Sequence, residues 1–104
     1  MSTKTPSGYT GLSEKVTTKV TEPPKYAVIL LNDNYTTFEF VVKVLVNIFR
    51  KNIPESVQIT NDVHRNGRGV CGLYSKEIAE TKVELVEQMT KKEGYPLKCV
   101  MEKT

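Results

Sequence analysis

Hydrophobic residues form blocks of two kinds along this chain, one continuous and the others periodic. The continuous block, YAVILL at residues 26–31, has the length of a buried strand, and it is bounded by two prolines and by a polar turn that starts at Asn32. In the later blocks, apolar residues recur every three or four positions, as in helices that bury one face. We therefore predict one strand followed by helices.

The first helix is predicted to begin at Thr36, because Thr36 and Glu39 have the spacing of a capping box. In such a box the Thr oxygen accepts a hydrogen bond from the Glu amide, and the Glu side chain accepts one from the Thr amide. The helical period continues as far as Lys51 and predicts one wide buried face. The members of this face are Phe38, Val41, Val42, Leu45, Ile48 and Phe49.

A second, more polar helix is predicted to start with Pro54, which suits a first helical turn. It is predicted to end at Gly67, which can take the left-handed conformation that terminates a helix. The segment RGVCGLY at residues 68–74 then alternates as a strand does.

A third helix is predicted after Ser75, with basic residues in its last turn before Gly94. Its apolar side is expected to consist of Ile78, Leu85, Val86 and Met89. A final strand over residues 97–101 closes the domain. The predicted fold class is α+β, a single small domain with the order β-α-α-β-α-β, in which a three-stranded antiparallel sheet is covered on one face by three helices.

The N-terminal segment differs in composition from the rest of the chain. It is rich in Ser, Thr, Gly and Pro and has almost no large aliphatic residue, so burial cannot offset the entropy of ordering it. We expect a flexible arm over residues 1–24 and a folded core domain over residues 25–104.

Length and charge narrow the range of functions. With 104 residues the chain has room for one domain. Its formal charge of +3 comes from 15 Lys and Arg spread among 12 Asp and Glu, without the clustered basic face typical of nucleic-acid binding. No apolar run approaches the ~18 residues of a membrane span, and no apolar signal core is present. We expect a cytoplasmic protein with no membrane partner.

Two alternatives stay open at this point. A cysteine hydrolase would use Cys71 as nucleophile, His64 as base and Asn32 or Asp33 as the orienting group, although Cys71 falls in the middle of a predicted strand. A nucleic-acid module would need five basic residues to converge on one face, and these are Lys43, Arg50, Lys51, Arg65 and Arg68. The two cysteines form no CxxC pair, so we expect reduced thiols, no metal site and no cofactor.

A candidate binding site follows from the predicted helices. On the second helix, Val57, Thr60 and His64 share one face. If that face meets the start of the first helix, an apolar dimple forms that would suit one apolar side chain with an amine attached. Its walls would be Phe38, Val41, Thr60 and Val63, with Asn32 and His64 on the rim. Taken alone, the polar turn is equally explained by capping, and a lone histidine by a structural role.

Three separated segments resemble the bacterial ClpS family in register, and they are LLNDNYTTFEFVVKVL, DVHRNGRGVCGLYSKEIAETK and GYPLKCVMEK. ClpS proteins are non-catalytic adaptors of the N-end rule, which bind proteins by a free N-terminal residue and hand them to an ATP-driven Clp protease. The resemblance spans Lys25 to the C-terminus. It implies a bacterial protein that binds a bulky hydrophobic first residue, either Leu, Phe, Tyr or Trp.

The resemblance also implies roles for residues at matching positions. The substrate's α-amino group and first peptide unit would be bound by Asn32, Asp33, Asn34, Thr36 and His64. The pocket for its side chain would be lined by Phe38, Val41, Thr60, Val63 and Leu97. Glu77 and Lys82 would contact the N-terminal domain of a ClpA-like AAA+ unfoldase, and the arm would be needed for handover. We expect a monomer with no nucleic-acid partner.

At three positions the chain departs from the pattern that the resemblance implies. Relatives often have Asp at the position of Asn34, Met or Pro at that of Phe38, and Met at that of Thr60. The first difference weakens the electrostatic attraction for an ammonium group, and the other two change the pocket wall. We therefore expect the binding mode of the family with a different side-chain preference.

Overall fold

The computed structural model describes residues 23–104, so most of the predicted arm, residues 1–22, lies outside the described residues. The elements follow one another in the predicted order β-α-α-β-α-β, which is confirmed. They are strand β1 (Tyr26–Leu31), helix α2 (Phe38–Asn47), helix α3 (Ile53–Asn66), strand β2 (Arg68–Tyr74), helix α4 (Lys76–Glu93) and strand β3 (Lys98–Lys103).

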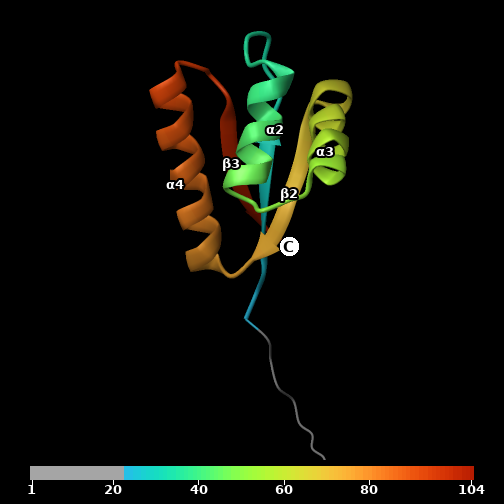
Figure 1. Ribbon diagram of the computed structural model, residues 1–104. Coiled ribbons are helices and arrows are strands. Elements are labelled where there is room, and N and C mark those ends of the chain that lie inside the picture. The colour runs from blue at the N-terminus through green and yellow to red at the C-terminus, as the bar shows by residue number, and fades with distance from the viewer. Residues whose placement is uncertain (1–22) are drawn as a thin grey trace, which may run out of the picture.

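The continuous apolar block forms the central strand of the sheet. The strand order is β2-β1-β3, and β1 pairs antiparallel with both neighbours. The three helices lie on one face of this sheet, as predicted (Figure 1). Val28 and Leu30 of β1 belong to the main core, and Ile29 between them is 1% exposed. The four inner residues of β1 are buried and its two end residues are half-buried, so an unbroken apolar sequence is what this position requires.

Helix α2 begins one residue later than predicted. Its N-cap is Thr37, whose Oγ1 accepts a hydrogen bond from the Phe40 amide at 3.2 Å, so the capping box of Thr36 with Glu39 is wrong. Thr36 is instead hydrogen-bonded to Asp33 in the preceding turn. The helix ends at Asn47 rather than reaching Lys51.

The buried face of α2 also differs from the prediction in part. Val41 and Leu45 are buried as expected, but Phe38 and Val42 are only half-buried. The other buried positions of the helix are Phe40 and Val44. The helical period was therefore predicted correctly, but the buried face of α2 is rotated around the helix axis relative to the prediction.

Helix α3 lies directly against β2 because β2 carries a glycine at the contact. A Cβ atom on Gly69 would lie 2.7 Å from Val63 Cγ2 and 3.0 Å from the Ile59 carbonyl oxygen, which is closer than side chains approach one another. The N-cap is Asn52, whose Oδ1 accepts from the Glu55 amide at 2.8 Å. The helix ends at Gly67 with a φ of 86°, as predicted.

Helix α4 has the predicted ends but a different inner face. Ser75 is the N-cap and Gly94 ends the helix with a φ of 82°. Val86 is buried, whereas Ile78 and Leu85 are 51% and 41% exposed, so their assignment to the apolar side is wrong. The buried positions beside Val86 are the smaller residues Ala79 and Thr90. Val83 and Met89 are partly buried and also pack against the core.

Candidate functional site

Most of the predicted binding residues lie at one end of the sheet, which we call the binding end. There, Leu31 of β1 pairs with the first residues of β2 and β3. In the sequence, Asn32 follows β1, Gly67 precedes β2 and Leu97 precedes β3. The Asn32 amide donates to the Gly67 carbonyl oxygen at 2.9 Å. The turn after β1, the C-terminal end of α3 and the segment before β3 therefore meet.

Asp33 holds the turn together. One oxygen of its carboxylate accepts from the amides of Tyr35 and Thr36, each at 2.7 Å, and the other accepts from Thr36 Oγ1 at 2.6 Å. These bonds bury Thr36 while Asn32 and Asn34 stay exposed. A carboxylate has about four acceptor positions, so roughly one of them is left for another donor.

The electrostatic environment favours the charged form of Asp33. Partial burial on its own would raise the pKa of this carboxyl group. The hydrogen bonds from Thr36 and Tyr35, together with the nearby His64 imidazole, outweigh this effect and lower the pKa below its ordinary value. Asp33 therefore contributes a negative charge to the binding end at neutral pH.

His64 and Phe38 meet at the mouth of the predicted dimple. His64 is exposed in the last turn of α3, and Phe38 is half-buried as the first residue of α2. Their ring centroids are 5.6 Å apart in an edge-to-face arrangement, with 61° between the ring planes. The two helices run in opposite directions, so this contact joins the start of one to the end of the other (Figure 1).

The other predicted pocket walls lie deeper and are buried. Val41 and Val63 are each 1% exposed, Thr60 is 0% exposed and Leu97 is 5% exposed. Thr60 tolerates this position because its Oγ1 donates to the Ser56 carbonyl oxygen at 2.7 Å. Together with Phe38 these residues are called the candidate pocket below. Of its walls, Phe38 is half-buried and the other four are buried.

The two residues assigned to unfoldase docking lie elsewhere. Glu77 is exposed in the first turn of α4. Lys82 is half-buried, and its Nζ donates to the Ile48 carbonyl oxygen at 2.7 Å, at the end of α2. The same Nζ lies 5.9 Å from the Phe49 ring centroid and 5.7 Å from that of Tyr74. Lys82 therefore caps a helix, a role that the sequence did not suggest.

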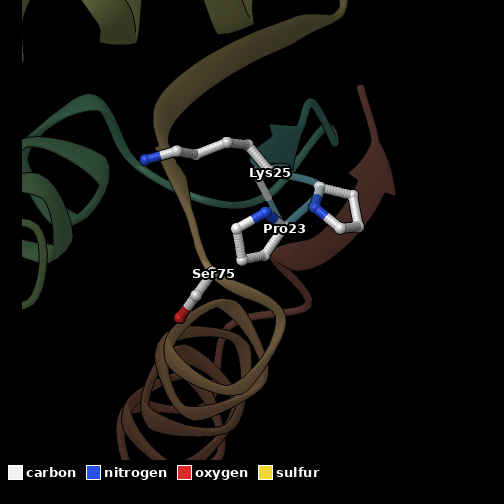
Figure 2. Close-up of a pocket in the computed structure, with 4 residues that line it drawn as sticks. Pro23, Lys25 and Ser75 are labelled. Carbon is white, nitrogen blue, oxygen red and sulfur yellow. The ribbon is translucent and has the colours of Figure 1, made fainter. Parts of the chain in front are cut away.

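The start of α4 and the segment that leads into β1 both lie at the end of the sheet opposite the binding end. Tyr26, the first residue of β1, pairs with Tyr74, and α4 follows directly. A hollow of about 280 Å³ at this end is lined by Pro23, Pro24, Lys25 and Ser75. Figure 2 shows three of these residues labelled, Pro23, Lys25 and Ser75. Five residue steps of β1 separate the two ends, which corresponds to roughly 17 Å.

The two thiols are unsuited to nucleophilic catalysis. Cys71 is 0% exposed and Cys99 is 7% exposed, and both are free. Burial raises the pKa of Cys71 far above its ordinary range, with Cys99 adding to the effect. Burial and the nearby Glu87 raise the pKa of Cys99 to about 12. Neither thiol forms the thiolate that the hydrolase alternative needs.

Within residues 23–104, the structure gives little support to a metal site, a nucleic-acid surface or a membrane-spanning helix. No three His, Cys, Asp or Glu side chains in this part of the chain lie close enough to hold a metal ion. Two of the five basic residues considered for nucleic acid are paired, Lys43 with Glu93 at 3.7 Å and Arg68 with Glu102 at 3.0 Å. Of the helices described, none is long and apolar enough to cross a membrane.

Comparison with known proteins identifies the family. A family model described as ATP-dependent Clp protease adaptor protein ClpS matches residues 21–100. The chain belongs to the ClpS family. The resemblance carried by the three sequence segments is thereby confirmed, and the relatives of the chain are named as adaptors of a Clp protease.

Relatives and a solved structure agree with this assignment. The ClpS adapter of Desulforapulum autotrophicum is 45% identical over 99% of both chains, and that of Ralstonia nicotianae is 54% identical over 77% of this chain and 74% of its own. The structure of Agrobacterium tumefaciens ClpS2 bound to L-phenylalaninamide matches with a TM-score of 0.77. It is 36% identical in sequence and covers 80% of this chain and 100% of the other.

One buried polar residue beside the candidate pocket was missed at the sequence level. Ser56 is 0% exposed on the inward face of α3, where Thr60 and Val63 also lie. The signal was present, because Ser56 precedes Thr60 by four positions and therefore shares its face. It was overlooked because a serine near a helix start is ordinarily interpreted as a solvated or capping residue.

Proposed function

We propose that this chain is an adaptor that binds proteins bearing a free N-terminal bulky hydrophobic residue and delivers them to a Clp AAA+ unfoldase-protease. The observation that carries the proposal is the contact of Phe38 with His64 in the last turn of α3, the helix at whose end the Gly67 carbonyl oxygen accepts from the Asn32 amide. The match to a ClpS2 protein that holds L-phenylalaninamide supports it, because that ligand has a free α-amino group next to an aromatic side chain.

The α-amino group of the substrate would be bound by acceptors at the rim. An ammonium group has three donors, and removing it from water is costly unless other acceptors replace the water. The side-chain oxygen of Asn32, a neutral nitrogen of His64 and the remaining acceptor position of Asp33 provide this replacement. The negative charge of Asp33 adds attraction that the uncharged Asn34 does not.

Asp33 and Thr36 contribute mainly by fixing the turn. Because three of the hydrogen bonds to the Asp33 carboxylate come from within the turn, loss of this side chain would release Asn32 and Asn34 from their positions. Asn34 is exposed and can reach the first peptide unit of a substrate. Thr36 is buried and acts through Asp33 rather than on the ligand.

The candidate pocket would accept the first side chain after Phe38 swings away. Phe38 is the half-buried wall, whereas Val41, Thr60 and Val63 are fully buried, so Phe38 is the wall that can move at least cost. Burying an aliphatic or aromatic side chain there contributes about 1.5–3 kcal/mol. Side chains branched at Cβ are widest at the entrance, where packed walls yield least. Leu, Phe, Tyr and Trp are therefore the preferred first residues.

Delivery would use the surface at the start of α4. Glu77 is exposed there and offers a carboxylate to a basic group on the N-terminal domain of a ClpA-like unfoldase. Lys82 is committed to the Ile48 carbonyl oxygen, so its contribution to docking would be to hold α4 against the end of α2. The chain acts as a monomer in this proposal.

The test is a titration of fluorescent peptides that start with Phe and differ only in acetylation of the α-amino group. Acetylation removes the positive charge and leaves rim acceptors unpaired, at about 1–3 kcal/mol for each acceptor. We expect an affinity loss of about a hundredfold or more, and a free-amine peptide starting with Ser should bind as weakly as the acetylated one. Equal binding of acetylated and free Phe peptides would exclude the proposed mode.

A further inference from the structure

Strand β3 has one edge that no strand of residues 23–104 covers. The strand order β2-β1-β3 places β3 at the side of the sheet, so only its inner edge pairs with β1. The strand at the other side, β2, is irregular, because its register with β1 shifts between Val28 and Ile29. A bulge makes an edge a poor template for a further strand. β3 pairs with β1 without such a shift, so its free edge is the regular one.

The alternation of hydrogen bonds in an antiparallel ladder shows which main-chain groups point to this free edge. The Thr104 amide donates to the Lys25 carbonyl oxygen at 3.0 Å, so this pair of residues turns its main-chain groups toward each other. Every second pair along the register does the same, and the pairs between them turn theirs outward. The turns, loops and helix ends of residues 23–104 form no main-chain hydrogen bond with the outward groups of β3. These groups belong to Cys99, Met101 and Lys103.

A hollow of about 230 Å³ lies between α4 and the first half of β3. Its lining consists of Glu87 of α4 and residues 97–100. Leu97 is also a wall of the candidate pocket, so the hollow and the pocket share a residue. Lys98, the first residue of β3, pairs with Leu31 at the binding end. The free edge of β3 therefore starts beside the place where a substrate would be held.

A substrate bound at the binding end has its following residues within reach of this edge. Neighbouring strands lie about 4.8 Å apart, so a fourth strand beside β3 would lie roughly 10 Å from β1. Three extended residues span about 10 Å. Asn32, which is proposed to hold the α-amino group, directly follows β1. The substrate therefore reaches the free edge with about its fourth residue.

We propose that the part of the substrate chain that follows its first residues binds as a fourth strand at the free edge of β3. This inference rests on the proposed function, because the first residue must be held at the binding end. The outward N–H and C=O groups of Cys99 and Met101 bond the main chain of the substrate, which any sequence without proline provides. The substrate then runs parallel to β3, toward the end of the sheet where α4 starts and where delivery is proposed.

The experiment compares two free-amine peptides of about ten residues that both start with Phe-Gly-Ser. In one, the later residues alternate between Val and Lys, so that it can form a strand. In the other, each Val is replaced by Pro, which has no N–H to donate and does not continue a strand. We expect wild-type protein to bind the strand-forming peptide about three- to tenfold more tightly than the proline peptide, as for one or two net main-chain hydrogen bonds.

A proline in β3 tests the edge from the side of the protein. Met101→Pro removes an outward amide and leaves the hydrogen bonds to β1 in place, so the preference for the strand-forming peptide should disappear. The matched control is Leu73→Pro on β2. Leu73 pairs with Ala27, whose main-chain groups face β3, so the Leu73 amide points to the free edge of β2. This control should keep the preference of wild type.

Amide hydrogen exchange of wild-type protein tests the inference without any variant. In the free protein, the amides of Cys99 and Met101 should exchange faster than that of Val100, which is bonded to β1. The strand-forming peptide should slow the exchange of these two amides, and the proline peptide should not. Slow exchange in the free protein would mean that the edge is already covered. Slowing that grows with protein concentration would identify a second copy as the occupant. Either result overturns the inference.

The peptide titrations also separate this inference from the proposed function. Equal and tight binding of the two free-amine peptides to wild-type protein overturns the role of the β3 edge and leaves the proposed function standing. If wild-type protein binds neither peptide, both are overturned.

Discussion

Replacement of Lys82 by Ala is expected to destabilise the fold, although Lys82 lies in a surface proposed for docking. The substitution removes the charged hydrogen bond to the Ile48 carbonyl oxygen, which is part-buried and 2.7 Å long. A hydrogen bond with a charged partner contributes about 1.5–3 kcal/mol. The Phe49 and Tyr74 rings lose a cation at just under 6 Å, which adds about 0.5–1 kcal/mol.

The expected loss in the free energy of unfolding is therefore about 2–4 kcal/mol. For a domain of this size, each kcal/mol lowers the melting temperature by about 4–8 °C, so Lys82→Ala should melt roughly 8–32 °C below wild type. Urea unfolding followed by circular dichroism measures the same free energy directly. The matched control is Glu77→Ala in the same helix, whose exposed side chain should change the stability by less than about 0.5 kcal/mol.

This result decides how docking can be tested. A double charge reversal at Glu77 and Lys82 would slow degradation through unfolding as well as through lost docking, so the two causes could not be separated. Glu77→Lys alone should keep peptide affinity and slow delivery to the protease. If Lys82→Ala is as stable as wild type, the bond to Ile48 does not form in solution, and the argument for a capping role fails.

Three further predictions concern the binding end. Phe38→Ala should raise the affinity for peptides starting with Ile or Val relative to Leu by about tenfold or more, since one misplaced methyl costs about 1–3 kcal/mol. If a peptide titration of the variant gives the same ratio of Leu to Ile affinity as wild type, Phe38 is not a movable wall. His64→Ala should weaken binding of free-amine peptides, because it removes a ring nitrogen that accepts from the ammonium group. A variant that binds these peptides as tightly as wild type would mean that His64 has no such role. Asp33 should stabilise the fold above about pH 4, because its pKa is lower in the folded state than in the unfolded chain, and this stabilisation should disappear as the pH falls through the folded-state pKa. Chemical unfolding from pH 2 to 7 should therefore show a smaller pH dependence for Asp33→Asn than for wild type, and equal slopes would contradict this.

The order and type of the elements could be predicted because the signals for them are local. The glycines at 67 and 94 end helices with left-handed φ angles, as their places after the periodic segments suggested. The start of α2 could not be settled in the same way. Thr36 and Thr37 are equally able to cap, and the choice falls to Thr37 because the Asp33 carboxylate takes both the amide and the hydroxyl of Thr36.

The directions of the buried faces were less predictable. Leu85 and Ile78 have the hydrophobicity of core residues, yet they are exposed, and the smaller residues Ala79 and Thr90 are buried in their place. The Lys82 bond joins residues 34 positions apart in the chain, so no local pattern reports it. At the binding end, spacing placed Thr60 and His64 on one face of a helix, whereas the contact of His64 with Phe38 depends on how two helices pack.

The antiparallel register of β1 has a consequence for assembly. Its first residue belongs to the end of the sheet where the chain enters and α4 starts, and its last residue belongs to the binding end. In the proposed function, the first residue of a substrate and an unfoldase domain would bind at opposite ends of this strand. We therefore expect a ternary complex to form in either order, with binding free energies that add.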